Sequence, residues 1–210
     1  MPGYYPVMMD LKGRDCVAVG GGEVAARKVE MLISCGANVT VVAPELEKSL
    51  QELVSSHKVK HINTPYRKGH LNGACLVIAS TDNTDVNRAV YDDASAAGIP
   101  VNVVDVPELC SFIVPAVVER GDLILAVSTS GKSPAMAKRI RKELQKQFGD
   151  EYAAMLRLMG EARRILMERE PDLDKRMRIL TDIANSDLMD RVKTGEKVRA
   201  EELVEGALGK

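Results

Sequence analysis

The chain has 210 residues, of which 45% are hydrophobic and only 3% aromatic, and its formal net charge is −1 at pH 7. This composition argues against a nucleic-acid-binding protein, which needs basic surface and aromatic stacking platforms. No stretch approaches the roughly 18 apolar residues of a membrane span, and residues 1–10 lack the pattern of a signal peptide. We therefore expect a cytoplasmic protein with no nucleic-acid or membrane partner.

In the first hundred residues, apolar runs typical of buried strands alternate with apolar residues at helical spacing. Short apolar runs predict β-strands at residues 15–20, 39–42, 59–62, 75–79 and 100–104. Apolar residues at helical spacing predict helices between them at residues 23–35, 45–56 and 83–97. Because strands alternate with helices, we predict an α/β fold, a Rossmann-type doubly wound parallel sheet.

The pattern changes after residue 105. Residues 112–119 and 123–128 read as two strands joined by a tight turn without an intervening helix, which predicts an antiparallel pair. Ser133 and Pro134 have the residue types that cap and open a helix. The rest is charged and helical, with breaks expected near Pro171, residues 185–187 and Gly195. We expect a Rossmann domain, a small α+β segment and a C-terminal helical domain, over residues 1–112, 113–148 and 149–210.

The first strand runs into the sequence Gly-Gly-Gly-Glu-Val-Ala, which fits the pattern G-x-G-x-x-[G/A] at Gly20, Gly22 and Ala25, with Gly21 inside the turn. Gly20 permits the tight turn, Gly22 lets a pyrophosphate approach the backbone, and Ala25 lets the helix pack closely on the sheet. The free N–H groups at the helix start attract phosphate. Since the motif lies at the first turn between a strand and a helix, it predicts dinucleotide binding.

Acidic and polar residues follow the second and fourth strands. Glu45 lies just after strand two, where an acid holds the ribose hydroxyls, and no arginine stands there for a 2′-phosphate, so NAD is favoured over NADP. Alternatively, Glu45 lies in the first turn of helix two and complements its dipole; both readings are compatible. Ser80, Thr81 and Asp82 lie where a dinucleotide crosses the sheet, although Thr81 or Asp82 is also suited to cap the next helix.

Asp105 ends the fifth strand, where a carboxylate beside a nicotinamide is placed to act as a general base. The alternative is a turn residue before Pro107, and position alone leaves both open. A later polar loop leads into a helix start and is a candidate site for an acidic substrate; it contains Ser128, Thr129, Ser130 and Lys132. The following helix carries Lys138, Arg139, Arg141, Lys142 and Lys146. The sequence favours a solvated basic face there over attraction of an anionic substrate.

The cysteines and histidines give no sign of a metal site. None of the cysteines is in a C-x-x-C spacing, and we expect reduced, mostly buried thiols at Cys16, Cys35, Cys75 and Cys110. The histidines are expected at the surface, away from Asp105; they are His57, His61 and His70.

Four segments, in chain order, resemble the precorrin-2 dehydrogenase/sirohydrochlorin ferrochelatase family: residues 20–28, 101–105, 109–112 and 128–134. The resemblance spans about residues 1–148. It implies oxidation of precorrin-2 to sirohydrochlorin with NAD in sirohaem biosynthesis, and a homodimer formed largely by residues 113–148. It also implies that Asp105 is the catalytic carboxylate and that Glu23, Val24, Pro44 and Glu45 lie at the NAD site.

Other features of the family bear on what else this chain does. Some members carry a modified serine at the position of Thr129, so threonine leaves such a modification open here. Some relatives also insert iron, and some carry a methyltransferase domain for which this chain is too short. Without an evident metal site we expect dehydrogenation alone. The alternatives are an NAD-sensing regulatory domain without catalysis, which would need the glycine turn but not Asp105, and a dehydrogenase for another substrate.

Overall fold

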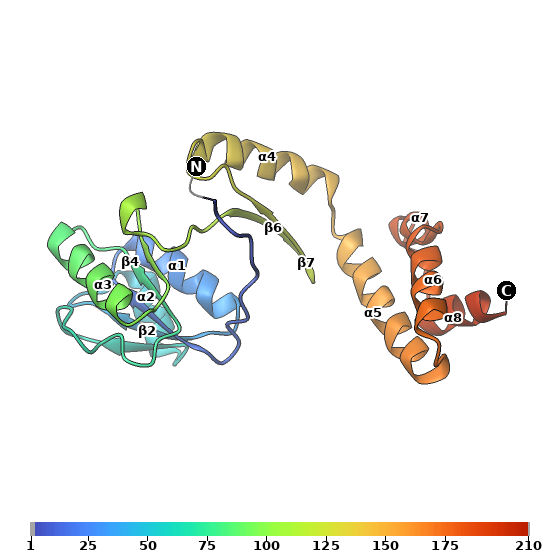
Figure 1. The fold of residues 1–210 in the computed structure, drawn as a ribbon, viewed down its shortest axis with the longest axis horizontal. Helices are drawn as coiled ribbons and strands as arrows, with labels where there is room; N and C mark the ends of the chain where they lie inside the picture. Colours follow the sequence, from blue (N-terminus) through green and yellow to red (C-terminus); the bar gives the residue numbers. More distant parts are fainter. Residues whose placement is uncertain (1–2, 210) are drawn as a thin grey trace. The chain divides into compact units, whose positions relative to one another are not determined.

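A computed structural model describes residues 3–209, which form two units, one up to Val114 and one from Pro115 onward (Figure 1). Among these residues no helix is long and apolar enough to cross a membrane. The cytoplasmic location stays a prediction.

The first unit contains a five-stranded parallel sheet, as the sequence predicts. Its strands are β1 (Asp15–Val19), β2 (Asn38–Val42), β3 (Val59–Ile62), β4 (Leu76–Ala79) and β5 (Val101–Val103), in the order β3-β2-β1-β4-β5. Val19 pairs with Val42 on one side and Ala79 on the other, so the carboxyl ends of the central strands reach the same edge. The strand order reverses beside β1, and the crevice at such a point is where this kind of sheet binds ligands.

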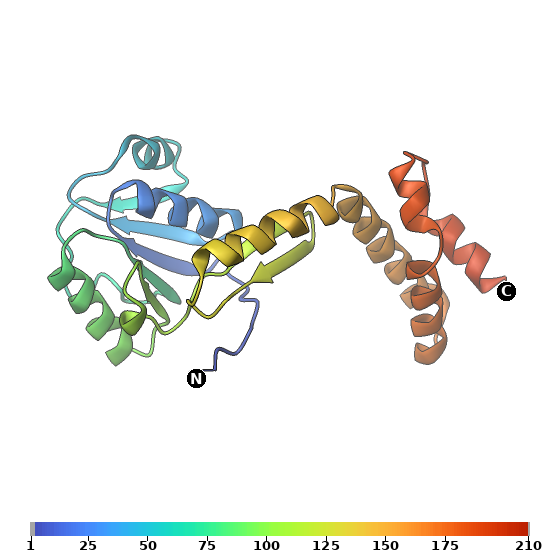
Figure 2. The same cartoon turned by 90° about the horizontal axis from the view of Figure 1, so that it is seen from above.

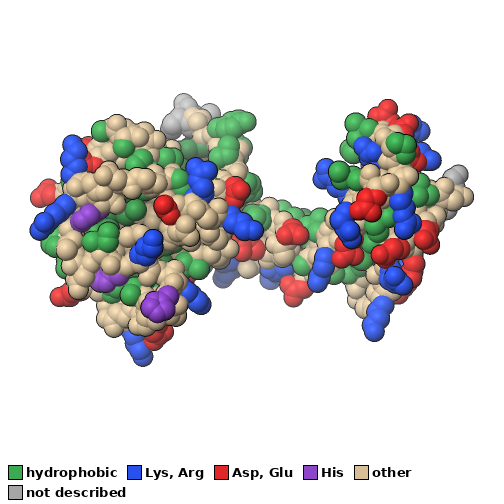
Figure 3. Space-filling view, turned by 90° about the horizontal axis from the view of Figure 1, so that it is seen from below, with side chains coloured by type: hydrophobic (Ala, Val, Ile, Leu, Met, Phe, Trp, Pro, Cys, Tyr) green, Lys and Arg blue, Asp and Glu red, His purple; other side chains and the backbone are tan. Residues whose placement is uncertain are grey.

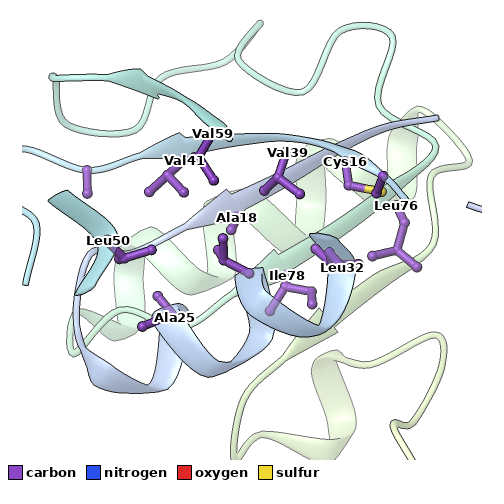
Figure 4. Close-up of a cluster of buried hydrophobic side chains, with 14 of the residues drawn as sticks. Cys16, Ala18, Ala25, Leu32, Val39, Val41, Leu50, Val59, Leu76 and Ile78 are labelled. Atoms are coloured by element: carbon purple, nitrogen blue, oxygen red, sulfur yellow. The ribbon is translucent and has the colours of Figure 1, made fainter. Parts of the chain in front are cut away.

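Helices cover both faces of the sheet, which confirms the doubly wound prediction. Helices α1 (Glu23–Ser34) and α2 (Lys48–Ser55) pack on one face and α3 (Thr84–Ala96) on the other (Figure 2). Because side chains alternate along a strand, Ala18 joins the α1 side while Val19 joins the α3 side. The cluster under α1 is aliphatic, as the scarcity of aromatic residues requires; Figure 4 labels Ala18, Ala25, Leu32, Val39, Val41, Leu50 and Ile78 within it.

The strand predicted for residues 112–119 begins later than expected. After β5 the chain makes a 3-10 turn (η1, Pro107–Leu109) and returns along the free edge of β5. There the Ser111 amide donates to the Val101 carbonyl at 2.8 Å, and the Ser111 hydroxyl accepts from the Val101 amide at 2.8 Å. These bonds hold the preceding residues against the first unit, so the strand β6 begins at Ala116.

The second unit begins with an antiparallel hairpin and a helix that lie side by side (Figure 2). Strands β6 (Ala116–Arg120) and β7 (Leu123–Val127) pair antiparallel, and α4 (Pro134–Gln147) packs on one face of them. Ser133 caps α4 by accepting from the Met136 amide at 3.2 Å, with Pro134 in the first turn, as predicted. The Arg120 guanidinium donates to the Gln145 carbonyl at 3.2 Å and so ties the hairpin to the end of α4.

Four further helices complete the second unit: α5 (Glu151–Arg169), α6 (Leu173–Ala184), α7 (Leu188–Lys193) and α8 (Ala200–Leu208). The helix breaks fall where the sequence predicts them. Apolar side chains from all four helices form one small core that includes Leu166, Ile179, Leu188 and Val204. Acidic and basic side chains are interspersed over these helices on the face drawn in Figure 3.

Candidate functional site

The glycine turn after β1 uses each of its three glycines differently. Gly20 has a φ of +127°, and a side-chain Cβ there would lie 2.6 Å from the Ser80 carbonyl oxygen. A Cβ on Gly21 would collide with the Glu45 carbonyl oxygen. A Cβ on Gly22 would meet nothing within 4 Å. Two glycines therefore permit close packing of the backbone, and the third leaves space in front of the helix α1.

That space suits a phosphate group. Gly22 is the N-cap of α1 and provides no side chain to bond the first N–H groups of the helix. Such N–H groups, together with the positive end of the helix dipole, bind phosphate. The geometry of the turn therefore fits the pyrophosphate of a dinucleotide. Ala25 is fully buried on the side of α1 that packs on the sheet, which matches the role expected for it.

The segment after β2 is attached to the glycine turn rather than folded into a helix. The Glu47 amide donates to the Gly21 carbonyl at 2.8 Å, and α2 begins only at Lys48. The prediction that helix two starts at Glu45 is therefore wrong, and with it the reading of Glu45 as a residue of the first helical turn. Because the segment bonds to the glycine turn, Pro44 and Glu45 are held beside the space in front of α1.

The segment after β4 borders the same space in front of α1, on a third side. Ser80, Thr81 and Asp82 lie there, as expected from the sequence. Neither Thr81 nor Asp82 caps the next helix: the cap of α3 is Asn83, whose side chain accepts from the Asp85 amide at 2.9 Å and from the Val86 amide at 3.1 Å. The Thr81 side chain is instead bonded to Asn87, a residue that the sequence analysis did not single out.

Asp105 lies in a tight turn directly after β5. The Val106 amide donates to the Val103 carbonyl at 3.2 Å, and Asp105 has a φ of +62°. Glycine or asparagine usually occupies such a left-handed position, and a non-glycine residue there costs about 1–3 kcal/mol, a strain found mainly at functional sites. Asp105 is therefore a turn residue, and the same turn presents its exposed carboxylate at the carboxyl edge of the sheet, where a general base is expected. The two interpretations of Asp105 are compatible.

Lys28 gives this region a second charge that the sequence analysis did not weigh individually. Its side chain on α1 is half-buried, and burial lowers the pKa of its ammonium group. The neighbouring charge of Arg27 also lowers this pKa, whereas the Asp105 carboxylate raises it. Lys28 is therefore near enough to Asp105 for the two charges to attract each other.

These walls enclose one cavity of about 930 Å³, which is within the range of cofactor and ligand sites. Its lining comes from residues 20–24, 42–47, 80–82 and 104–105. The cavity thus brings together every cofactor residue proposed from the sequence except the buried Ala25, and Asp105 with them. Its acidic lining residues are Glu23, Glu45, Glu47, Asp82 and Asp105, and none of the lining residues in the described part of the chain is basic.

The polar loop proposed for an acidic substrate lies in the second unit, and it is internally bonded. The Thr129 hydroxyl donates to the Ser133 carbonyl at 3.1 Å and accepts from the Ser133 amide at 3.1 Å. The Ser128 hydroxyl accepts from the Ser130 amide at 3.0 Å, and Ser130 has a φ of +53°. The Lys132 side chain is exposed. The loop is thus a compact turn in front of α4.

The basic side chains of α4 lie mostly in solvent. Lys138, Arg139, Lys142 and Lys146 line a shallow surface groove, and Arg139 pairs with Glu143 at 3.0 Å. Arg141 is half-buried. This arrangement matches the solvated basic face that the sequence favours.

The cysteines are less buried than expected. Cys16 is buried, but Cys75 and Cys110 are half-buried and Cys35 is exposed, because Cys35 follows the last turn of α1 rather than facing the sheet. The sulfur atoms of Cys16 and Cys75 are 3.7 Å apart, so both remain free thiols.

The histidines lie in the first unit, where Figure 3 shows histidine side chains at the surface. His57 is exposed, as expected, whereas His61 and His70 are half-buried. One ring nitrogen of His61 lies 2.9 Å from the Ala43 carbonyl oxygen. The expected surface position is therefore confirmed, and this contact holds His61 against the end of β2. Within residues 3–209 no three His, Cys, Asp or Glu side chains gather as a metal site.

Two protein families match the chain. Residues 7–116 match the family described as "Putative NAD(P)-binding", and residues 120–147 match "Sirohaem biosynthesis protein central". The first match covers the cavity and the whole parallel sheet. The second covers the turn of the hairpin, β7 and α4.

Named relatives agree with these matches. The siroheme synthase of Methylobacillus flagellatus is 38% identical over 97% of this chain, and that of Photobacterium profundum is 36% identical over 95%. These alignments cover 44% and 42% of the two relatives, so the chain spans less than half of their length. The solved structure named "SirC, precorrin-2 dehydrogenase" is 26% identical, with a TM-score of 0.80 over 99% of this chain and all of that one. The chain belongs to the NAD(P)-binding family that matches residues 7–116, and its first unit is a domain for a nicotinamide cofactor.

Proposed function

We propose that this protein oxidises precorrin-2 to sirohydrochlorin with NAD, in the biosynthesis of sirohaem. The observation that carries the proposal is that one cavity is lined by both the glycine turn and Asp105. A sensor of NAD needs the first feature but not the second. Support for the substrate comes from the relatives named siroheme synthase and from the structure named precorrin-2 dehydrogenase, whose full length this chain covers.

The reaction removes a hydride and a proton from the tetrapyrrole, and each needs an acceptor. Bound NAD would supply the hydride acceptor. We assign the proton to the Asp105 carboxylate, which the turn after β5 presents as an exposed base at the carboxyl edge of the sheet. The α1 N-terminus and the backbone at Gly22 would hold the pyrophosphate. Lys28 lies near enough for its positive charge to attract the Asp105 carboxylate.

The direct test is an assay with purified protein, precorrin-2 and NAD, in which sirohydrochlorin is followed by its absorbance. We expect sirohydrochlorin only when NAD is present. Tight NAD binding without turnover would overturn the proposal in favour of a sensor domain. A second arm adds Fe²⁺: we expect no enzyme-dependent sirohaem, and its appearance would show that the chain also inserts iron.

We also propose NAD rather than NADP as the cofactor. The β2 side of the cavity carries Glu45 and Glu47, and a ribose 2′-phosphate would be repelled by these carboxylates. Calorimetry should give NAD at least tenfold tighter binding than NADP. Glu45→Arg should narrow this difference, whereas Glu52→Arg, on the exposed face of α2, should not. Equal binding of the two cofactors by the unmodified chain would contradict the assignment.

A homodimer formed through residues 113–148 is the third part of the proposal. A two-stranded hairpin is marginal by itself, and only one face of this hairpin packs on α4. On its other face Ile124 is 47% exposed and Ala126 is exposed beside the half-buried Val117. Light scattering should give twice the chain mass, and Ile124→Lys should give a folded monomer. A monomeric wild-type chain at micromolar concentration would contradict this part.

A further inference from the structure

The side chain of Asn87 is almost fully buried on α3 and spends its hydrogen-bonding capacity on a single residue. It is 6% exposed. Its Nδ2 donates to the Thr81 carbonyl at 2.9 Å, and its Oδ1 accepts from the Thr81 hydroxyl at 2.8 Å and from the Thr81 amide at 3.3 Å. One amide group therefore satisfies the backbone donor, the backbone acceptor and the hydroxyl of Thr81.

This contact acts on the cavity, because Thr81 lies in the segment that forms its β4 wall. The segment belongs to neither β4 nor α3, so no sheet or helix hydrogen bond fixes the conformation of Thr81 itself. Ordering one residue of such a segment costs conformational entropy. The hydrogen bonds from Asn87 offset this entropy loss when the chain folds, so Thr81 is ordered before any cofactor binds.

The chemistry of the contact selects asparagine. Thr81 offers two donors and one acceptor to a buried place, and a side-chain amide offers the complementary acceptor and donor. Aspartate has the same shape, but both of its oxygens accept when ionised, so one of them would face the Thr81 carbonyl oxygen without a proton between them. Leucine would leave the Thr81 amide and carbonyl without these partners, and the Thr81 hydroxyl would keep only its bonds to the Asn83 backbone.

We propose that Asn87 is a positioning residue for the nicotinamide cofactor, which holds the β4 wall of the cavity in its binding conformation. The proposal rests on cofactor binding in this cavity. Asn87 does not line the cavity and acts only through Thr81. When a site is in its binding conformation for only a fraction of the time, its apparent Kd rises in inverse proportion to that fraction. Loss of the contact should therefore weaken cofactor binding and leave the chemical step intact once the site is saturated.

The test compares Asn87→Asp with Asn83→Ala. Asn83 caps the same helix but does not bond Thr81 through its side chain, and loss of such a cap destabilises the helix. It therefore controls for a general weakening of α3. Both variants and the wild type are titrated with NADH, whose own fluorescence reports binding. The KM for NAD and the kcat are then measured with precorrin-2.

We expect Asn87→Asp to raise the Kd for NADH about tenfold and the KM for NAD similarly, with kcat within about twofold of the wild type. Asn83→Ala should leave all three unchanged within about twofold. Equal effects of both variants, or an unchanged Kd in Asn87→Asp, would overturn the positioning role. Failure of the wild type itself to bind NADH would instead overturn the proposed function.

A second variant keeps the test decisive if Asn87→Asp does not fold. Thr81→Val has nearly the same shape and removes the hydroxyl bonds to Asn87 and to the Asn83 backbone. Both bonds between Asn87 and the Thr81 backbone remain. We expect it to raise the Kd for NADH about threefold, in line with the loss of the neutral hydrogen bonds of a single hydroxyl group. An unchanged Kd in this folded variant would count against the proposal.

Discussion

The backbone amide of Glu47 donates a hydrogen bond to the carbonyl oxygen of Gly21, with the nitrogen and oxygen 2.8 Å apart. The bond joins the glycine turn to the segment after β2, so two walls of the cavity form one unit. It also explains why the middle glycine of the turn matters: the Glu45 carbonyl oxygen lies directly against the Gly21 Cα.

Substitutions in the glycine turn should separate folding from cofactor binding. Gly21→Ala places a Cβ against backbone and should destabilise the chain by about 1–3 kcal/mol, as overpacking does. Gly22→Ala points its Cβ into open space and should cost no more than about 1 kcal/mol. Its Cβ occupies the space in front of α1, so NAD affinity should fall at least tenfold. Urea titration and calorimetry measure the two effects, and full NAD affinity in Gly22→Ala would exclude the phosphate position proposed here.

Asp105→Asn should abolish turnover while leaving the fold and NAD binding intact. Asparagine tolerates the left-handed conformation at this position as well as aspartate does, so we expect stability within about 0.5 kcal/mol of the wild type. Loss of a general base should lower kcat by a factor of about 100 or more. Glu108→Gln, an exposed acid in the next turn, is the matched control. Wild-type kcat in Asp105→Asn would remove this carboxylate from the mechanism.

Acid should weaken the C-terminal helices through Glu170. The Lys175 ammonium, 2.8 Å away, and the Asp172 amide hold the pKa of the Glu170 carboxyl below its ordinary value of 4.5. A lowered folded-state pKa adds stability above pH 4.5 that disappears as the pH falls through the folded-state pKa. Urea midpoints measured from about pH 6 to pH 3 should therefore fall less in Glu170→Gln than in the wild type.

The exposed Glu168, in the last turn of α5 just before Glu170, provides the control for that measurement. Glu168→Gln should keep the acid dependence of the wild type. If the two variants respond to pH in the same way, the ion pair of Glu170 does not account for the acid sensitivity.

Cys16 should resist alkylation in the folded chain. Burial, and then the adjacent Cys75 thiol, raise the pKa of Cys16 to about 12. At pH 8 only about one such thiol in ten thousand is ionised, and the thiolate is the reactive form. Iodoacetamide should therefore modify the exposed Cys35 long before Cys16, as read by peptide mass spectrometry, and urea should remove the difference. Equal rates in the folded chain would show that Cys16 is accessible and ionised.

The parallel sheet was predictable because the hydrophobic period within each strand and helix is a local property of the sequence. The apolar run that ends at Gly20 predicts β1, and the helical spacing of apolar residues around Val29 predicts α1, without reference to any other segment. All five strands lie where they were predicted. Boundaries that depend on long-range bonds were not predictable. Helix α2 starts at Lys48 because Glu47 bonds to Gly21, and β6 starts at Ala116 because Ser111 bonds to Val101.

The residue types of the candidate site can be identified from local pattern alone. The glycine turn, the acid after β2, the polar run after β4 and Asp105 after β5 all follow strand ends that the hydrophobic period predicts. Tertiary structure decided how these parts act on one another. Asn87 lies only six residues after Thr81, but its residue type does not show that its side chain turns back from α3 to bond Thr81. Likewise, Lys28 and Asp105 are far apart in the chain, and only the closure of α1 over the sheet brings their charges within reach. The physical reason is that periodicity and turn chemistry are local properties of the chain, whereas hydrogen bonds and charge interactions between distant segments exist only once the sheet has formed.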